Sequence, residues 1–227
     1  MQSLPAPPAF APRHDIYGPV HKGLRRAHAD LMGRLGWADY AADQHRLLAE
    51  LREHLRLAAK HLAHEEAHIH PALDARAPNG AARLDQQHGH HRARFAEVEH
   101  RIRAVEAGGG PAAGRALYLE FARMVAEDLA HMHEEETVTW PRLCALFSDN
   151  ELLTMEMTII ASLTPEDVIA FMRMMIPAMN PSERAALLGG MKAGAPPEAF
   201  AAVYEHAVRA TLGAQDLEGL ERLGLAA

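Results

Sequence analysis

The sequence predicts an all-α protein in which an up-down-up-down four-helix bundle is followed by a region of shorter helices. Of the 227 residues, 48% are hydrophobic but only 5% are aromatic, and the abundant Ala, Leu, Glu and Arg favour helices. Four long stretches between residues 15 and 147 repeat apolar side chains at steps of three and four, as amphipathic helices do. We therefore expect a disordered arm at 1–14, a bundle at 15–147 and a helical extension at 148–227.

The first two helices of the predicted bundle each place histidines on their inward stripe. The first is expected from about Asp15 to Leu35, and the second from an N-cap at Asp39 to the breaker at 77–80. The second stripe closes on His61 and Glu65, so the helix is expected to end with this pair. The inward residues are Tyr17, His21, Leu24, His28, Leu31 and Leu35 in the first helix, and Leu47, Leu51, His54, Ala58, His61 and Glu65 in the second.

The third and fourth helices show the same pattern. The third stripe runs to the glycines at 108–110, and the fourth is expected to be interrupted near Pro141. The short connections predict antiparallel neighbours. The inward residues are Leu84, His88, His91, Phe95, Val98, Ile102 and Val105 in the third helix, and Leu117, Phe121, Met124, Asp128, His131 and Glu135 in the fourth.

Beyond residue 148 the sequence predicts shorter helices with strong start signals. Caps are expected at Ser148 with Glu151, at Thr164 before Pro165-Glu166-Asp167, and at Asn180 before Pro181-Ser182-Glu183. A final helix is expected from Pro197 to about Leu212. The methionines of this region are interpreted as adaptable core or as a self-association surface.

The most informative feature is a pair of His-to-Glu steps, His61/Glu65 and His131/Glu135, each spanning one helical turn. Residues at i and i+4 share a helix face, so each pair can offer two ligands to one metal. A single pair has an ordinary explanation as a solvated helix end. In an antiparallel bundle, however, the starts of the first and third helices lie level with the ends of the second and fourth, which brings in His21 and His88.

These six polar side chains would be costly to bury together without a partner, and a metal pair would remove that cost. Mixed nitrogen and oxygen donors suit iron, manganese or zinc. His91 is interpreted as a fifth ligand, an outer hydrogen-bond donor or a packed core histidine, and Asp128 as a group that orients a ligand. Tyr17 could close the pocket or simply pack. His28 and His54 lie two turns deeper and are expected to hydrogen-bond to each other, with a deeper proton or ion site as the alternative.

The motifs that contain these residues resemble hemerythrin-like (HHE cation-binding) domains over about residues 15 to 147. They are Ile-Tyr-Gly-Pro-Val-His-Lys-Gly-Leu-Arg at 16–25, His-Leu-Ala-His-Glu-Glu at 61–66 with Ile-His-Pro following, His88, and His-Met-His-Glu-Glu at 131–135. The C-terminal region is similar to the helical extension of a bacterial subgroup, through Met-Ile-Pro-Ala-Met-Asn-Pro-Ser-Glu-Arg and Ala-Pro-Pro-Glu-Ala-Phe.

The resemblance implies a non-haem di-iron centre that takes dioxygen, nitric oxide or related oxidants. It assigns His21, His61, His88 and His131 as terminal ligands, and Glu65 and Glu135 as bridging carboxylates. Oxygen-carrying hemerythrins have a His-x-x-x-His pair on the third helix, whereas Arg92 follows His88 by four here. This departure argues against a stable oxygen carrier and leaves sensing, iron handling or redox chemistry open. Binding or sensing is favoured over turnover. A di-iron oxidase or peroxide-reducing enzyme, and an iron or zinc store or structural bundle, are the alternatives.

The net charge and the absence of targeting signals in the sequence limit which partners and which cellular location we expect. The net charge of −7 without a basic cluster argues against nucleic acid, and no apolar run approaches the length of a membrane span. The Pro-rich start lacks the features of a signal peptide, and the single cysteine, Cys144, cannot form an internal disulfide. We expect a cytoplasmic protein that binds a small diatomic ligand or oxidant, with a homodimer or protein contact through the C-terminal region.

Overall fold

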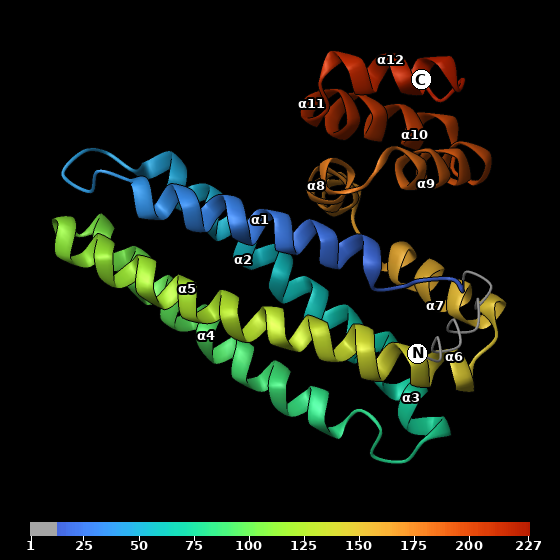
Figure 1. Ribbon diagram of the computed structural model, residues 1–227, viewed down its shortest axis with the longest axis horizontal. Coiled ribbons are helices and arrows are strands. Elements are labelled where there is room, and N and C mark those ends of the chain that lie inside the picture. The colour runs from blue at the N-terminus through green and yellow to red at the C-terminus, as the bar shows by residue number, and fades with distance from the viewer. Residues whose placement is uncertain (1–12) are drawn as a thin grey trace, which may run out of the picture.

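Residues 13–227 are described by a computed structural model, and this part of the chain is helical, with no strand. Its four long helices extend along the longest dimension of the molecule (Figure 1). They are α1 (Gly18–Trp37), α2 (His45–His64), α4 (Ala82–Glu106) and α5 (Gly110–Glu134). Helix α1 packs against α2 and α5, and α4 packs against the same two helices. The all-α prediction is confirmed.

The core between the long helices is aliphatic with few aromatic rings, as the composition predicted. Leu51, Ile102, Phe121 and Met124 are fully buried there, and Phe171 reaches the same core from the C-terminal region. Their periodic spacing is what gave each helix its inward stripe. Among residues 13–227, no helix combines the length and the apolar character that a bilayer span requires.

The start of α2 differs from the prediction that Asp39 is its N-cap. The Asp39 side chain accepts a hydrogen bond from the backbone N–H of Ala41, so it stabilises a turn in the connection instead. The helix begins at His45, whose backbone N–H donates to the Asp43 side chain. Both aspartates occur in the same polar connection, and sequence alone could not show which one adjoins the helix.

Helices α2 and α5 do not end at their His/Glu pairs. Each passes through one π-helical turn, η1 (Glu65–Ile69) or η2 (Glu135–Thr139), and continues as a short helix, α3 (His70–Arg76) or α6 (Trp140–Leu146). Pro71 and Pro141 lie in the first turn of these continuations. Proline lacks the N–H of an α-helical bond and clashes with the carbonyl four residues back. The wider π turn accommodates it, so the expected interruption near Pro141 is a change of helical register.

The C-terminal region consists of short helices, and its predicted start signals are confirmed. Ser148 and Glu151 form a capping box, Asn180 and Glu183 form another, and the Thr164 side chain accepts from the backbone of Asp167. The helices are α7 (Asp149–Ser162), α8 (Pro165–Met175), η3 (Ile176–Ala178), α9 (Pro181–Gly194), α10 (Pro197–Val203), η4 (Tyr204–Val208), α11 (Arg209–Thr211) and α12 (Ala214–Arg222). The last helix, α12, was not predicted. It covers a second apolar core with Leu220.

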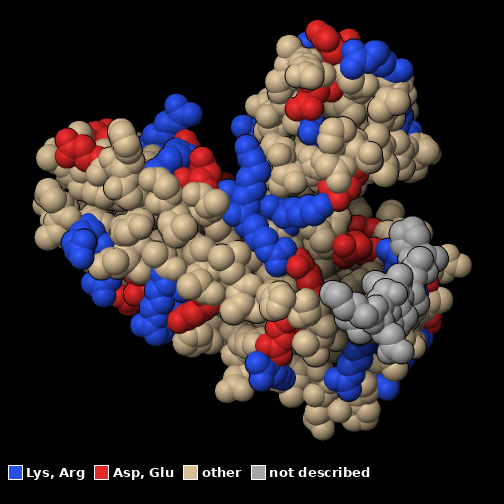
Figure 2. All heavy atoms as spheres, viewed as in Figure 1, with Lys and Arg blue, Asp and Glu red and all other residues tan. Residues whose placement is uncertain are grey.

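Ion pairs attach the C-terminal helices to the long ones. Asp167 at the start of α8 is buried between Arg56 and Lys60 of α2, and the Arg56 Nη1 to Asp167 Oδ1 distance is 2.6 Å. These two cations hold the pKa of Asp167 at about 2. Lys22 of α1 pairs with Glu183 of α9. Basic side chains gather with acidic ones where the two parts of the molecule meet (Figure 2).

The residues just before α1 are also fixed to α7. Arg13 donates from Nε to the Asp149 side chain at 2.6 Å, and His14 Nε2 lies 2.8 Å from a carboxylate oxygen of Glu156. These two residues are the end of the predicted disordered arm at 1–14. The rest of that arm lies outside the described residues.

Gly114 is expected to be intolerant of a side chain. It lies in α5 against the Tyr40 ring, and an added Cβ would be 2.1 Å from two of the ring carbons. We expect Gly114→Ala to lower the free energy of unfolding by about 1–3 kcal/mol through overpacking. In Gly33→Ala of α1 the Cβ meets nothing within 4 Å, so we expect a gain of roughly 0.5–1 kcal/mol. Urea unfolding of both variants measures this, and effects of equal sign would contradict the prediction.

Candidate metal centre

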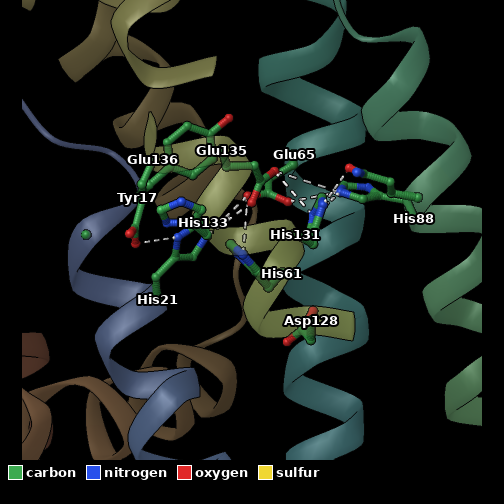
Figure 3. A network of polar contacts seen from close by, with 12 residues as sticks. Tyr17, His21, His61, Glu65, His88, Asp128, His131, His133, Glu135 and Glu136 are labelled. Carbon is green, nitrogen blue, oxygen red and sulfur yellow. Dashed lines mark hydrogen bonds and ion pairs between the residues drawn. The ribbon is translucent and has the colours of Figure 1, made fainter. Parts of the chain in front are cut away.

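The structure brings the six predicted ligand residues into one buried cluster. His21 comes from α1 and His88 from α4, while His61 and His131 lie in the last turns of α2 and α5. Glu65 and Glu135 begin the two π-helical turns. In Figure 3 the two carboxylates lie in the middle, with His21 and His61 on one side and His88 and His131 on the other. The four helices place these residues at one level, and π turns are frequent at functional sites.

The cluster consists of two groups that share both carboxylates. One contains His21, His61, Glu65 and Glu135, and the other contains His88 and His131 with the same two glutamates. Within each group, one nitrogen or oxygen from every residue lies within 4.8 Å of the others. Either buried group can therefore hold a metal ion.

The shortest contacts point the inner nitrogen of each histidine toward the carboxylates. His61 Nε2 lies 3.2 Å from Glu65 Oε1, and His131 Nε2 lies 3.4 Å from Glu135 Oε1. His88 Nε2 is 3.4 Å from Glu65 Oε2. His21 Nε2 is 3.4 Å from the nearer oxygen of Glu135 and 3.9 Å from that of Glu65. Each glutamate thus lies between histidines of both groups.

Outer carboxylates fix the orientation of two of the histidines. His21 donates from Nδ1 to Glu136 at 3.0 Å, and His88 donates from Nδ1 to Glu66 at 3.2 Å. A proton on Nδ1 leaves the lone pair on Nε2, which is the tautomer that a metal-binding histidine needs. Hydrogen bonds of this kind also orient the ring and increase the basicity of the ligand nitrogen.

Two arginines complete these outer contacts in a repeated arrangement. Arg25, four residues after His21, makes a double hydrogen bond to Glu136 at 2.5 and 2.9 Å. Arg92, four residues after His88, donates to Glu66 at 2.6 Å. The same His-x-x-x-Arg step thus occurs in both halves, and each pairs with the glutamate that follows a shared carboxylate. Arg92 therefore contacts this site through Glu66.

The halves differ at the residue before the α1 and α4 histidines. Gln87 precedes His88, and its side-chain oxygen accepts from His131 Nδ1 at 2.9 Å. Val20 precedes His21 and cannot accept a hydrogen bond. His61 is 7% exposed, more than the other five residues of the cluster. The two sides of the centre therefore have different surroundings.

The inner part of the cluster has acceptors without donors. His131 donates its Nδ1 proton to Gln87, and His88 donates its Nδ1 proton to Glu66. The Nε2 atoms of both histidines therefore present lone pairs, yet these two atoms are 3.0 Å apart. The buried atoms without a hydrogen-bond partner among the described residues include His21 Nε2, His61 Nε2 and all four oxygens of Glu65 and Glu135. Leaving such a group unpaired costs roughly 1–3 kcal/mol. Cations between these atoms would satisfy them.

Burial also perturbs the protonation of the cluster when only protein groups surround it. The pKa of Glu65 is raised well above its ordinary value by burial and by the Glu135 charge. Burial and the Asp128 charge raise that of Glu135. Burial lowers the pKa values of His88 and His131 to about 3, and lowers that of His61 strongly. These three histidines are therefore neutral without metal, as metal ligation requires, whereas the two carboxyl groups must release protons when a metal binds.

The three residues predicted as additional or outer groups adjoin the cluster but belong to neither ligand group. Tyr17 stacks on His21 with ring centroids 5.2 Å apart, and its buried hydroxyl has no hydrogen-bond partner among the described residues. The His91 ring lies 4.9 Å from the His131 ring, and His91 Nδ1 is 3.8 Å from Asp128. In Figure 3 Asp128 lies apart from the two carboxylates.

Asp128 binds a deeper histidine and not one of the predicted ligands. Its carboxylate accepts from His28 Nε2 at 2.7 Å. The other His28 nitrogen contacts His54 Nε2 at 2.9 Å, which confirms the predicted hydrogen bond between these two histidines. All three side chains are buried. The expectation that Asp128 orients a ligand histidine is therefore replaced by a separate polar chain in the core.

The outer glutamates were the functional candidates that sequence reasoning missed. No role was predicted for Glu66, Glu136 or His70, whereas in the structure the two glutamates are half-buried and His70 is buried. His70 Nδ1 contacts Asp85 at 2.6 Å. A signal was present: His-x-x-x-Glu-Glu-x-x-x-x-Pro occurs at 61–71 and again at 131–141. That repeat marks both the outer glutamate and the proline behind each π turn.

No protein-family model matches this chain, and comparisons with curated proteins and with solved structures found no match. The class that the fold and site define is an all-helical protein with buried His/Glu groups that can hold a metal ion. This description is compatible with a hemerythrin-like fold.

Removing one outer glutamate is expected to weaken metal binding without removing a ligand. In Glu136→Ala the His21 ring loses its Nδ1 acceptor, and we expect metal affinity to fall by about 10- to 100-fold. The amount bound at saturation should stay unchanged. Glu97→Ala is the matched control because, among residues 13–227, Glu97 pairs only with Arg101 on the surface of α4. Competition with a chromophoric chelator measures both constants, and equal affinities would contradict the outer role of Glu136.

Proposed function

We propose that this protein is a hemerythrin-like metalloprotein whose long helices form an up-down-up-down bundle around a dinuclear non-haem iron centre. In this proposal His21, His61, His88 and His131 are terminal ligands, and Glu65 and Glu135 bridge the two ions. The protein binds or senses dioxygen, nitric oxide or a related oxidant. The bound iron would supply a redox-active site for such a molecule.

One observation carries the proposal: two groups of buried donors share two carboxylates. Each group offers two imidazoles, and both glutamates belong to each. Carboxylates shared between two cations reduce their mutual repulsion. Nitrogen and oxygen donors without sulfur suit iron, manganese or zinc. A single cation would leave the histidines of one group without a partner, so the donor set supports two ions.

The contacts between helices support the bundle. Each of the four long helices packs on two of the others, and the connections between successive helices are short. Short connections favour antiparallel neighbours. The chain direction reverses from α1 to α2 and again from α4 to α5 in Figure 1.

The residues of this chain favour ligand binding over turnover. Two of the ligand histidines are held by Glu66 and Glu136, and a third by Gln87, so the donors are oriented in advance. Tyr17 closes the cluster beyond His21 and keeps a hydroxyl buried beside it. A hydroxyl in that place can donate a hydrogen bond to a small ligand. The proposal assigns no nucleophile and no general base, so it includes no catalytic step.

The test is to load the protein anaerobically with ferrous iron, remove the excess and count the iron per chain. Visible spectra before and after air, and again under vacuum, accompany the count. Close to two irons per chain with an oxygen-dependent band is the expected result, and reversal under vacuum distinguishes binding from oxidation. Little iron and no band would overturn the iron proposal, and tight zinc binding in the same protein would assign a structural metal site.

A further inference from the structure

The strongest unassigned feature is an apolar cavity between the long helices and the C-terminal helices. It has a volume of about 120 Å³. Val20 of α1 and Ile69 of η1 form one wall, Ile159 of α7 a second, and Phe171 and Met172 of α8 a third. The cavity therefore exists only where the C-terminal region covers the long helices.

The inner end of this cavity is the metal centre itself. His61 and Glu65 line it directly, so one terminal ligand and one shared carboxylate border the apolar space. The other polar side chains of the lining are His64 and Glu156. His64 lies beside Phe171, with ring centroids 6.0 Å apart, and Glu156 is engaged by His14.

The cavity also explains the difference between the two halves of the centre. Gln87 holds His131 on one side, whereas the corresponding residue on the other side is Val20, which lines the cavity. On the His61 side, the apolar side chain of Val20 thus stands where the other side has a hydrogen-bond acceptor, and it offers a surface for apolar contacts. The C-terminal helices α7 and α8 then cover part of the space over that residue.

We propose that this cavity binds a small, neutral, apolar organic molecule beside the metal centre. Its size selects the ligand: an apolar cavity of roughly 150 Å³ stays dry and admits benzene or xenon. Its charge selects against anions, because no Lys or Arg occurs among the described residues that line it, while Glu65 and Glu156 do. Flexible methionines such as Met172 and Met175 can adjust to the shape of the ligand.

This site goes beyond the proposed function and does not need iron for binding. A molecule held there contacts the His61 and Glu65 side chains, so it changes the surroundings of the metal centre as a substrate or an effector would. The C-terminal helices supply most of the apolar lining and therefore determine which class of ligand fits. Those helices consequently acquire a role at the centre without supplying a ligand to it.

The isoleucines of this chain provide an internal map for the test. Four of the seven, Ile16, Ile69, Ile159 and Ile160, line the cavity. The remaining three, Ile102, Ile169 and Ile176, lie in other packed clusters. We would label the isoleucine δ-methyl groups of the full chain and titrate benzene while recording methyl NMR spectra, on metal-free and on zinc-loaded protein.

The expected result is a saturable shift of the four cavity methyl groups with the other three unchanged, in both samples. Shifts spread over all seven, or none at the four, would overturn the proposal. The metal count is measured separately, so failure of the iron proposal and failure of this one are distinguishable. Shifts that appear only after removal of residues 1–12 would also overturn it for the full chain, because that segment would then be the occupant.

Variants that fill the cavity test the location independently. Val168→Phe adds volume to the lining, and Met172→Phe is a second choice should the first fail to fold. We expect at least about a tenfold loss of benzene affinity in either. Val138→Phe is the matched control, since Val138 is 60% exposed and not part of the cavity lining. Unchanged benzene binding in the folded filling variants would overturn the assignment.

Discussion

Glu135→Ala is expected to lose both metal ions of the proposed dinuclear centre, whereas His61→Ala is expected to lose one. Glu135 belongs to both ligand groups, while His61 belongs to only one of them. Removal of an outer partner of a metal ligand already costs up to about 100-fold in affinity, so loss of a shared carboxylate should exceed that. Elemental analysis after loading and desalting gives the number of ions per chain.

The same variant is expected to separate metal binding from folding. Glu135 is fully buried, and neither of its oxygens has a hydrogen-bond partner among the described residues. Removing this side chain removes the free-energy cost of burying an unpaired polar group in the metal-free protein. We therefore expect Glu135→Ala to keep its helical circular dichroism. Metal should raise the thermal midpoint of the wild type but not of the variant.

His45→Ala is the control for these measurements, because His45 is exposed at the start of α2, far along the helix from the cluster. It is expected to change neither metal content nor helicity. Full metal content in Glu135→Ala would contradict the ligand assignment. An equal loss in Glu135→Ala and His61→Ala would contradict the arrangement of two groups with shared carboxylates.

The ligand cluster could be predicted because helical periodicity carries three-dimensional information. His61/Glu65 and His131/Glu135 share a face by spacing alone, and antiparallel packing fixes the level of the two remaining histidines. The hydrogen bond between His28 and His54 followed from the same register. Helix starts at Ser148, Thr164 and Asn180 were also predictable, since capping depends on residues three positions apart.

The remaining features depend on contacts between distant segments. No role was predicted for Glu66 and Glu136, and only the packed helices show that each accepts a hydrogen bond from a candidate ligand histidine on another helix. Asp39 and Asp43 offer the same carboxylate before the helix, and only the observed start of α2 at His45 shows which one lies beside it. The apolar cavity exists only because α7 and α8 cover one side of the centre.

Asp128→Ala is expected to destabilise the metal-free protein by removing a buried polar partner outside the ligand set. Asp128 is 3% exposed and accepts from His28, which in turn contacts His54. Removing the carboxylate leaves the buried His28 N–H without its acceptor, which costs about 1–3 kcal/mol. Asp30→Ala, which breaks the exposed pair with Arg34, is expected to cost less than about 1 kcal/mol. Urea unfolding of the metal-free proteins gives both values, and similar costs would contradict the buried pair.

Acid should reduce the advantage of the wild type over Asp128→Ala. Burial alone would raise the pKa of Asp128, but the hydrogen bond and charge of His28 hold it below the ordinary value of 3.8. A carboxyl whose pKa is lower in the folded state stabilises the fold above its unfolded pKa, and this stabilisation disappears as pH falls. The difference in unfolding free energy between the two proteins should therefore be present at pH 5–7 and shrink below about pH 4. A difference that grows below pH 4 would show that the Asp128 carboxylate is not paired in the folded protein.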